Sequence, residues 1–186
     1  MLPDPGGRSP APEPLRMVQA FVNTVDIENR REELVSPSDL RDVLIRVGAL
    51  APNADPLNEA DLRLALEVRE ALRSLLLENN ARAPDADGRA TLERAARAAH
   101  LSLRFAPEGG LDLAPSAAGL DGALGRLLAV VYTAMAAGTW PRLKACPRDV
   151  CFWVFYDRSK NLSGKWCAMS VCGNRTKKAR GSRRPS

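Results

Sequence analysis

The sequence has little of what most enzymes use for catalysis and no segment long enough to span a membrane. Its 186 residues include one histidine, His100, and only 5% aromatic residues. It contains no glycine-rich phosphate-binding loop, nucleophile elbow or HExxH motif. The longest nearly apolar stretch, residues 127–138, is shorter than the ~20 residues that cross a bilayer, and no basic-then-apolar leader opens the chain. These absences predict a soluble cytoplasmic protein that is not an enzyme.

Charge is divided unevenly along the chain, whose formal net charge is +5. Residues 141–186 contain 12 Lys and Arg against 2 Asp, whereas the preceding residues contain 15 Lys and Arg against 20 acidic residues. The two parts therefore carry about +10 and −5. A compact basic segment attached to a mildly acidic body is typical of proteins that bind polyanions, and nucleic acid is the leading candidate partner.

The N-terminal part of the chain has the pattern of a tail followed by helices. Residues 1–14 contain five prolines and two glycines, which predicts a disordered tail. Apolar residues then recur at intervals of three and four, as they do on the buried stripe of a helix. The expected helices cover residues 15–29, 37–48, 58–79, 90–100 and 116–137, with residues 83–88 as a loop.

Local signals sharpen two of these elements. Ser36 followed by Pro37 predicts the start of the second helix, and Gly48 predicts its end. Residues 101–105 and 111–113 flank two glycines in the way that two short strands flank a β-hairpin turn. Residues 15–139 therefore predict one mainly α-helical domain that carries a small β-hairpin.

The composition changes beyond Trp140-Pro141. Six of the nine aromatic residues and all four cysteines lie between residues 140 and 172. This change predicts a hinge at Trp140-Pro141 and a separate small module over residues 140–180. Residues 181–186 predict a basic, disordered tail.

The cysteines have the spacing Cys146-x4-Cys151-x15-Cys167-x4-Cys172. Two close pairs separated by a short insert can converge on one tetrahedral ion, and zinc binds four thiolates at about 2.3 Å. The insert begins with the strand-forming run 152–156 and returns through residues 165–166, which predicts a hairpin between the pairs. Because a module of about 40 residues buries too little apolar surface to fold unaided, we predict one structural Zn²⁺ held by all four cysteines.

Other uses of the cysteines are weaker interpretations. Two disulfides would need an oxidising compartment, which disagrees with the expected cytoplasmic location. Four coordinated sulphur atoms would leave no open position at which a catalytic zinc could activate water. Redox-active cysteines and an iron–sulphur cluster are further alternatives.

The segment Trp166-Cys167-x4-Cys172-Gly173-Asn174-Arg175-x-Lys177 carries a specific combination of residues. Together with the upstream cysteine pair and Phe155-x-Asp157-x-Ser159-Lys160-Asn161, it resembles the CGNR-type zinc finger, which is named after its Cys-Gly-Asn-Arg tetrapeptide. The preceding helical part is similar to the ABATE domain of stress-induced transcription regulators, through Phe21-Val-Asn-Thr24 and Arg69-Glu-Ala-Leu72.

This resemblance implies a bacterial, zinc-dependent, DNA-binding transcription regulator that acts in a stress response and is associated with the nucleoid. The implied fold is mainly α, with a helical N-terminal domain followed by a small α+β finger that is treble-clef-like or ribbon-like. The finger would contact DNA. The helical domain would sense a small-molecule effector or mediate homodimerisation.

The basic residues of the finger, together with Asn174, are the candidates for DNA contact. Arg158, Lys160 and Lys165 lie at the expected hairpin tip, where they either touch phosphates or form a solvated loop. The remaining candidates follow Cys172 and are Asn174, Arg175, Lys177, Lys178 and Arg180. Arg175 has the donors to read a guanine, whereas Asn174 either reads an adenine or braces the metal loop.

In the helical body, Asn23, Thr24 and Arg69 are candidates for binding a ligand. They could equally bond to one another or to a neighbouring carbonyl group, and Arg69 could pair with a glutamate on the same helix. Two other function classes stay open, namely an RNA-binding module and a protein-interaction adaptor that uses the zinc finger.

Overall fold

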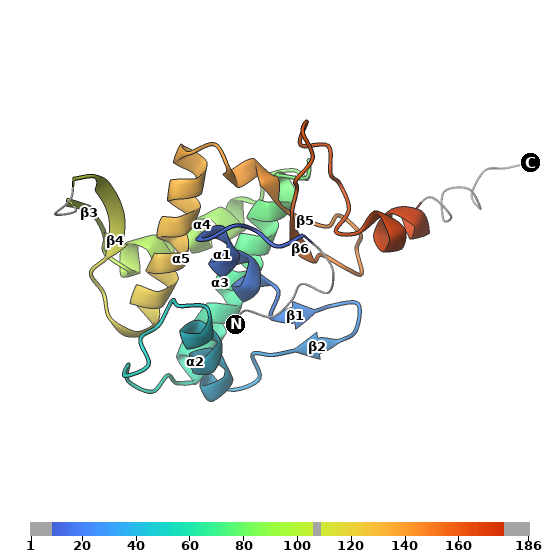
Figure 1. Cartoon of the computed structure of the whole chain (residues 1–186). Helices are drawn as coiled ribbons and strands as arrows, with labels where there is room; N and C mark the ends of the chain where they lie inside the picture. The colour runs from blue at the N-terminus through green and yellow to red at the C-terminus, as the bar shows by residue number, and fades with distance from the viewer. Residues whose placement is uncertain (1–8, 106–108, 177–186) are drawn as a thin grey trace, which may run out of the picture.

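The computed structural model of the chain describes residues 9–105 and 109–176 (Figure 1). As the sequence predicts, these residues form a mainly α-helical body followed by a small four-cysteine finger. The body helices are α1 (Leu15–Val22), α2 (Pro37–Arg46), α3 (Glu59–Glu78), α4 (Ala86–Ala98) and α5 (Gly119–Ala136). Within the described ranges, no helix combines the length and the hydrophobicity that crossing a membrane requires.

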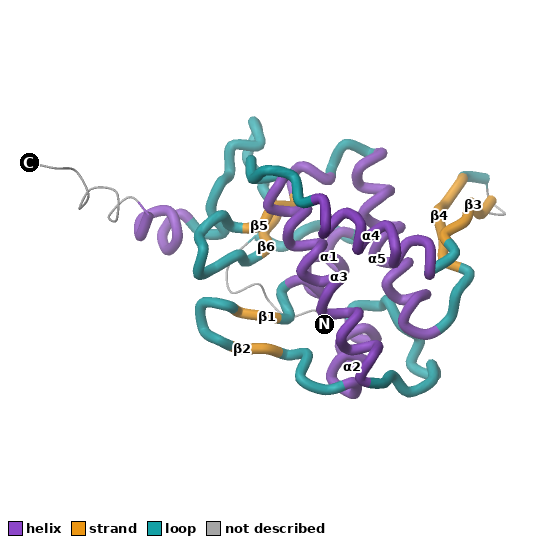
Figure 2. The backbone as a smooth tube through the Cα atoms, turned by 180° about the vertical axis from the view of Figure 1, so that it is seen from behind, coloured by secondary structure: helices purple, strands orange, loops and turns teal. Residues whose placement is uncertain are grey.

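The longest helix, α3, is the central element of the body. It packs against α1, α2, α4 and α5, and the first residues of the finger also pack on it. The largest fully buried apolar side chains of the body come from these helices and are Phe21, Leu40, Leu44, Leu72, Leu76, Leu124 and Leu127. Both views place the finger and the hairpin of strands β3 (Leu101–Phe105) and β4 (Leu111–Pro115) at opposite ends of this body (Figures 1 and 2).

Helix α2 confirms the start and end that the sequence predicts. The Ser36 side chain accepts a hydrogen bond from the Asp39 backbone N–H, and the Asp39 carboxylate accepts one from the Ser36 N–H at 2.9 Å. This reciprocal capping satisfies two backbone donors that a helix start leaves without partners. At the other end, Gly48 has a φ of +80°, a conformation that glycine adopts without strain.

Helix α1 is shorter than the sequence predicts. It ends at Val22, whereas the predicted helix continues to residue 29. The Thr24 hydroxyl donates to the Phe21 carbonyl at 2.9 Å, and the chain then leaves the helix. Strands β1 (Val25–Asp26) and β2 (Arg31–Glu32) follow and pair as a small antiparallel hairpin.

Helix α4 begins earlier than predicted, inside the stretch 83–88 that was expected to be a loop. The Asp85 side chain accepts a hydrogen bond from the Gly88 N–H at 3.1 Å and so caps the helix at Ala86. The chain then forms the predicted hairpin, with β3 (Leu101–Phe105) antiparallel to β4 (Leu111–Pro115).

Part of the N-terminal segment lies against the body. The prediction of a disordered tail over residues 1–14 does not hold for residues 9–14, while residues 1–8 lie outside the described part. The carbonyl of Ser9 accepts hydrogen bonds from Tyr156 N–H at 3.1 Å and from the Gln19 side chain at 3.2 Å. Ala11 is buried and donates its N–H to the same glutamine at 2.8 Å. These contacts with distant residues hold a segment whose composition alone suggests disorder.

The finger contains strands β5 (Leu143–Ala145) and β6 (Val154–Tyr156), which pair antiparallel with Ala145 opposite Val154. The predicted hairpin, which pairs residues 152–156 with residues 165–166, is therefore wrong. Strand β6 cannot include Phe152, because the backbone there has a φ of +50°. The strand instead pairs with the segment that precedes the first cysteine.

The junction between body and finger is packed rather than free. Residues 140–142, where the sequence predicts a hinge, form one turn of 3-10 helix, and the side chain of Trp140 is 4% exposed. Leu143, Ala145 and Val154 are buried in the same apolar core as the body helices. Body and finger therefore share a core across this junction.

Candidate metal centre and its surroundings

Four cysteines from separate turns converge at the centre of the finger. The Sγ atoms of Cys146, Cys151, Cys167 and Cys172 all lie within 4.8 Å of one another, and all four side chains are buried. The Sγ of Cys167 is 3.6 Å from those of both Cys151 and Cys172. Four sulphur atoms bound to one zinc at ~2.3 Å are about 3.8 Å apart, whereas disulfide-bonded sulphurs are ~2.05 Å apart. The site therefore fits one tetrahedral ion, and the four cysteines are not disulfide-bonded.

Backbone hydrogen bonds place the first cysteine pair at the end of the β5–β6 hairpin. Cys146 follows β5 directly, and its N–H donates to the Trp153 carbonyl at 2.9 Å. The chain then turns back, and the Cys151 N–H donates to the Arg148 carbonyl at 2.8 Å. The positive φ of Phe152 completes this turn, so both thiols point toward the same space.

The second pair is held by a short helical turn, Met169–Gly173. Cys172 lies within this turn, and its N–H donates to the Ala168 carbonyl at 3.0 Å. A side chain at Gly173 would place its Cβ 2.2 Å from the Met169 Sδ and 3.2 Å from Trp166 Cδ1. A larger residue at this position would therefore force the Met169 side chain to move, and glycine lets Met169 and Trp166 pack closely against the turn.

Close contact between sulphur atoms shifts the pKa values of three of the thiols. The pKa of Cys146 is lowered to about 4 because the thiols of Cys151 and Cys167 donate hydrogen bonds to its sulphur. The same contacts to Cys146 raise the pKa values of Cys151 and Cys167. Zinc binds cysteine as the thiolate, so a divalent ion at this site would favour ionisation of its sulphur ligands. The donor set and its geometry fit a structural zinc.

An arginine and a glutamate adjoin the thiols. Arg148 Nη1 lies 3.9 Å from the Cys172 Sγ and donates to Glu28 Oε1 at 2.9 Å. Glu28 belongs to the turn between β1 and β2, and it also pairs with Arg175 Nη1. The hydrogen bond from Arg148 lowers the pKa of Glu28 and keeps this carboxylate ionised. No local pattern in the sequence marks Arg148 or Glu28 as part of this site.

A buried ion pair shapes the loop at the tip of the finger. Lys144 Nζ donates to Asp157 Oδ2 at 2.8 Å, and both side chains are at most 5% exposed. The lysine also donates to the carbonyls of Leu162 and Gly164, at 2.6 and 2.9 Å. Burial opposes the ionisation of Asp157, but hydrogen bonds from Lys144 and Ser159 outweigh it and lower its pKa to about 2. The loop is thus organised around one internal charge pair.

The predicted DNA-contact residues of this loop lie at the surface. Arg158, Lys160 and Lys165 are all exposed. Arg158 donates to the Pro10 carbonyl at 2.9 Å and lies over the Tyr156 ring, while the ammonium group of Lys165 lies 5.8 Å from the Trp166 ring centre.

The remaining DNA candidates lie beyond Cys172. Asn174 and Arg175 are exposed, and Asn174 Nδ2 donates to the Ser170 carbonyl at 3.4 Å, within its own helical turn. Lys177, Lys178 and Arg180 lie outside the described residues.

Polar side chains of α1 hold the edge of strand β6. Asn23 Nδ2 donates to the Val154 carbonyl at 2.9 Å, and the Val154 N–H donates back to Asn23 Oδ1 at 2.8 Å. Gln19 Nε2 donates to the same carbonyl at 3.1 Å. The side-chain amide of Asn23 therefore pairs with the strand as a neighbouring strand would. Asn23 was a candidate for binding a ligand or for bonding to a neighbouring carbonyl group. In the structure, it bonds to a carbonyl group.

Thr24 and Arg69 also bond within the protein. Arg69 binds the Glu32 carboxylate through two nitrogens, at 2.7 and 2.8 Å, and donates to the Thr24 hydroxyl at 3.1 Å. The expected pair with a glutamate on the same helix is present as well, with Glu70 at 2.8 Å. Arg69 thereby ties α3 to the base of the β1–β2 hairpin.

Further contacts from α3 reach the finger and were missed from the sequence. Asn79 Nδ2 donates to two carbonyls of residues 140–143, and Asn80 Nδ2 donates to those of Ala145 and Lys165. The sequence does contain a pattern that could have predicted these contacts, because two asparagines directly follow the long amphipathic helix. Side chains at a helix end are well placed to bind neighbouring backbone groups.

A further arginine on α3 also reaches the finger. The buried Arg73 donates to the Phe152 carbonyl at 3.0 Å and to the Val22 carbonyl at 2.6 Å. It thus joins α3, the end of α1 and the turn that precedes β6. A charged residue on the buried face of a predicted helix is the signal that could have identified it.

Comparison with known protein families gives two matches, in the order that the sequence analysis expects. Residues 15–139 match the ABATE family, described as "Putative stress-induced transcription regulator". Residues 142–185 match the CGNR zinc finger. No curated protein matches the chain. Neither family description names a catalytic activity.

Proposed function

Since the chain belongs to the ABATE family and ends in a CGNR zinc finger, we propose that it is a zinc-dependent, DNA-binding transcription regulator. One observation carries the proposal, namely four buried thiols that converge in a finger whose loop residues 158–165 and Arg175 expose cations. A zinc ion bound by four cysteines stabilises the fold and has no open coordination position at which a substrate or water could react. Cations displayed around such a site suit the phosphate backbone of a nucleic acid.

The metal would order two basic segments together. Arg158, Lys160 and Lys165 lie on the loop between the two cysteine pairs, and Arg175 follows the last cysteine. Each segment adjoins a cysteine of the cluster in the chain, and the first is also held by the Lys144–Asp157 ion pair. Loss of zinc should therefore remove the fixed arrangement of these basic side chains. DNA binding would then depend on the metal.

We also propose that two copies act together on DNA. One small finger covers too few base pairs to specify a site, so a homodimer or two adjacent half-sites would be needed. Sedimentation of the protein with and without a duplex would measure the number of chains bound. A single chain per saturated specific site would contradict this part of the proposal.

The test is fluorescence-anisotropy binding of the zinc-loaded protein to a mixed-sequence DNA duplex over a series of salt concentrations. We expect a log–log salt slope of about −4 to −6, which corresponds to about five phosphate contacts. Chelation of zinc should abolish the binding, and Cys172→Ser should behave like the chelated protein. The same titration with RNA of matched length and charge provides the comparison.

Three outcomes would contradict the proposal. Tighter binding to structured or single-stranded RNA would indicate an RNA-binding module. Weak, salt-insensitive binding to both nucleic acids would indicate an adaptor whose finger contacts protein. Binding to DNA that survives both chelation and Cys172→Ser would remove the metal from the function.

A further inference from the structure

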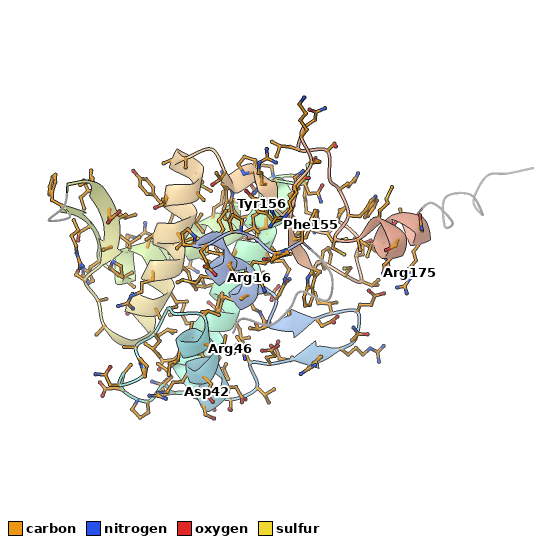
Figure 3. The ribbon with its side chains drawn as sticks, viewed as in Figure 1. Arg16, Asp42, Arg46, Phe155, Tyr156 and Arg175 are labelled. Carbon is orange, nitrogen blue, oxygen red and sulfur yellow. The ribbon has the colours of Figure 1, made fainter. Side chains whose placement is uncertain are left out.

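A carboxylate of the helical body lies between two arginines of the finger. Glu28 Oε1 accepts a hydrogen bond from Arg148 Nη1 at 2.9 Å and pairs with Arg175 Nη1 as well. These partners are 120 and 147 residues away along the chain. Glu28 is mostly buried, with 22% of its side chain exposed, whereas the Arg175 side chain is 56% exposed. Figure 3 shows Arg175 on the last helical segment, beyond the end of the β1–β2 hairpin.

The body holds this carboxylate in place. The turn that carries Glu28 is closed by Asn29, which donates to Asp26 at 2.7 Å. At the base of the hairpin, Glu32 receives the two-nitrogen contact from the buried Arg69. The position of Glu28 is therefore set by α3 and the hairpin rather than by a flexible side chain alone.

The two arginines form a site for an oxyanion. Two guanidinium groups converge on one carboxylate oxygen, which is the arrangement that also binds a phosphate oxygen. Arg148 is tied to the metal centre as well, because its Nη1 lies 3.9 Å from the Cys172 sulphur. An anion bound here would contact Arg148, which adjoins Cys172, and Arg175, the arginine of the Cys-Gly-Asn-Arg motif, at once.

We propose that Arg148 and Arg175 form a binding site for a backbone phosphate of DNA, and that Glu28 occupies this site when DNA is absent. The inference rests on the proposed function and deepens it, since it adds Arg148 to the DNA-contact surface. It also means that the helical body, through Glu28, competes with DNA for two arginines of the finger. DNA binding then exchanges one anion for another.

The exchange has a measurable consequence. Removing the competing carboxylate should free both arginines for phosphate and tighten binding to any duplex about three- to tenfold at low salt. Because additional phosphate contacts release additional counterions, the log–log salt slope should become steeper by about one. Sequence preference should not change, because phosphate contacts carry no base information.

The experiment compares duplex binding of full-length, zinc-loaded wild type and Glu28→Gln by anisotropy over a salt series. The matched control is Glu33→Gln, which removes the same charge from a neighbouring residue whose carboxylate pairs with Arg46 at 2.6 Å, away from the finger. Zinc content and thermal melting establish that each variant is folded. We expect tighter binding for Glu28→Gln and wild-type binding for Glu33→Gln.

A double-mutant cycle separates masking of the site from a general effect of charge. Arg175→Gln changes an exposed side chain and should leave the fold intact. In the wild-type background it should weaken binding less than twofold, because Glu28 already occupies that guanidinium. In the Glu28→Gln background it should remove most of the gain. Arg148→Gln should behave in the same way, which extends the test to the second arginine.

Opposite results would overturn the inference while leaving the proposed function standing. If wild type binds DNA and Glu28→Gln binds equally or more weakly, Glu28 orients the arginines instead of masking them. If Glu33→Gln gives the same gain, or if the gain survives Arg175→Gln and Arg148→Gln, the effect is one of net charge. If no variant binds DNA in the zinc-loaded state, the proposed function itself fails and the inference with it.

Discussion

Removal of zinc should destabilise the whole chain and not only the finger. Leu143 and Val154, on either side of the first cysteine pair, are fully buried in the core that the body helices also form. Gln19 of α1 and Asn80, just after α3, hold the backbone of these strands, and Arg73 of α3 holds the turn before β6. Without the ion, the thiols no longer tether the β5–β6 hairpin, and we expect these strands to leave the core.

The magnitude follows from what the strands contribute. Full burial of two side chains of the size of Leu143 and Val154 contributes about 3–6 kcal/mol. Each hydrogen bond from the body to the finger adds about 1 kcal/mol when both partners are buried. A loss of about 5 kcal/mol is comparable with the 5–15 kcal/mol by which domains are stable. For a chain of this length, it should lower Tm by about 10–20 °C.

Calorimetry of the zinc-loaded and chelated protein is the direct measurement. The loaded protein should unfold in one transition, and the chelated protein should unfold in one transition at lower temperature. Hydrogen exchange of α1 and α3 should rise on chelation, because these helices lose their contacts with the finger. Leu143→Ala in the zinc-loaded protein is the matched control and should cost about 2–5 kcal/mol by itself.

A body that melts at an unchanged temperature after chelation would refute this reasoning. That result would mean that the finger is a separate module joined by a hinge, as the composition beyond Trp140 suggests. The shared core and the amide contacts would then contribute nothing measurable to the body. An unchanged Tm in Leu143→Ala would lead to the same conclusion.

Further predictions concern the finger itself. Asp157→Asn should lower the free energy of unfolding in urea by about 3–5 kcal/mol, because it leaves Lys144 buried without its counter-charge, and replacing both by apolar residues should restore most of the loss. Burial opposes ionisation of Asp157, but its hydrogen bonds lower the pKa from 3.8 to about 2. Its contribution is therefore complete above pH ~4 and is lost as pH falls toward 2, so the difference between wild type and Asp157→Asn should stay constant from pH 8 to pH 5. Gly173→Ala should weaken zinc binding in a chelator competition, because the new methyl group meets the Met169 side chain. Adding Met169→Ala should restore the affinity. Wild-type zinc affinity in Gly173→Ala would show that Met169 moves aside without cost. Lys165→Ala should make the DNA salt slope shallower by about one for every duplex, whereas loss at a single base position would show that Lys165 reads sequence.

Much of the secondary structure and the metal site could be predicted because their signals are local. The start of α2 depends on Ser36, Pro37 and Asp39, which are near neighbours in the chain. The four cysteines and their spacing carry enough chemistry to indicate one tetrahedral ion before any contact is known. Periodicity misplaced the ends of α1 and α4, because those ends depend on capping bonds made by Thr24 and Asp85.

The sequence by itself determined the helical class of the body, the four cysteines of the candidate metal site and the basic character of the finger. Only the tertiary structure decided that Trp140 is part of the core and that Lys144 neutralises Asp157. It alone placed Glu28 between Arg148 and Arg175. Sequence patterns report helix or strand propensity, residue spacing and charge among residues that are close together in the chain. A contact between residues more than a hundred positions apart depends on how the elements between them pack, and a single sequence carries no local record of that packing.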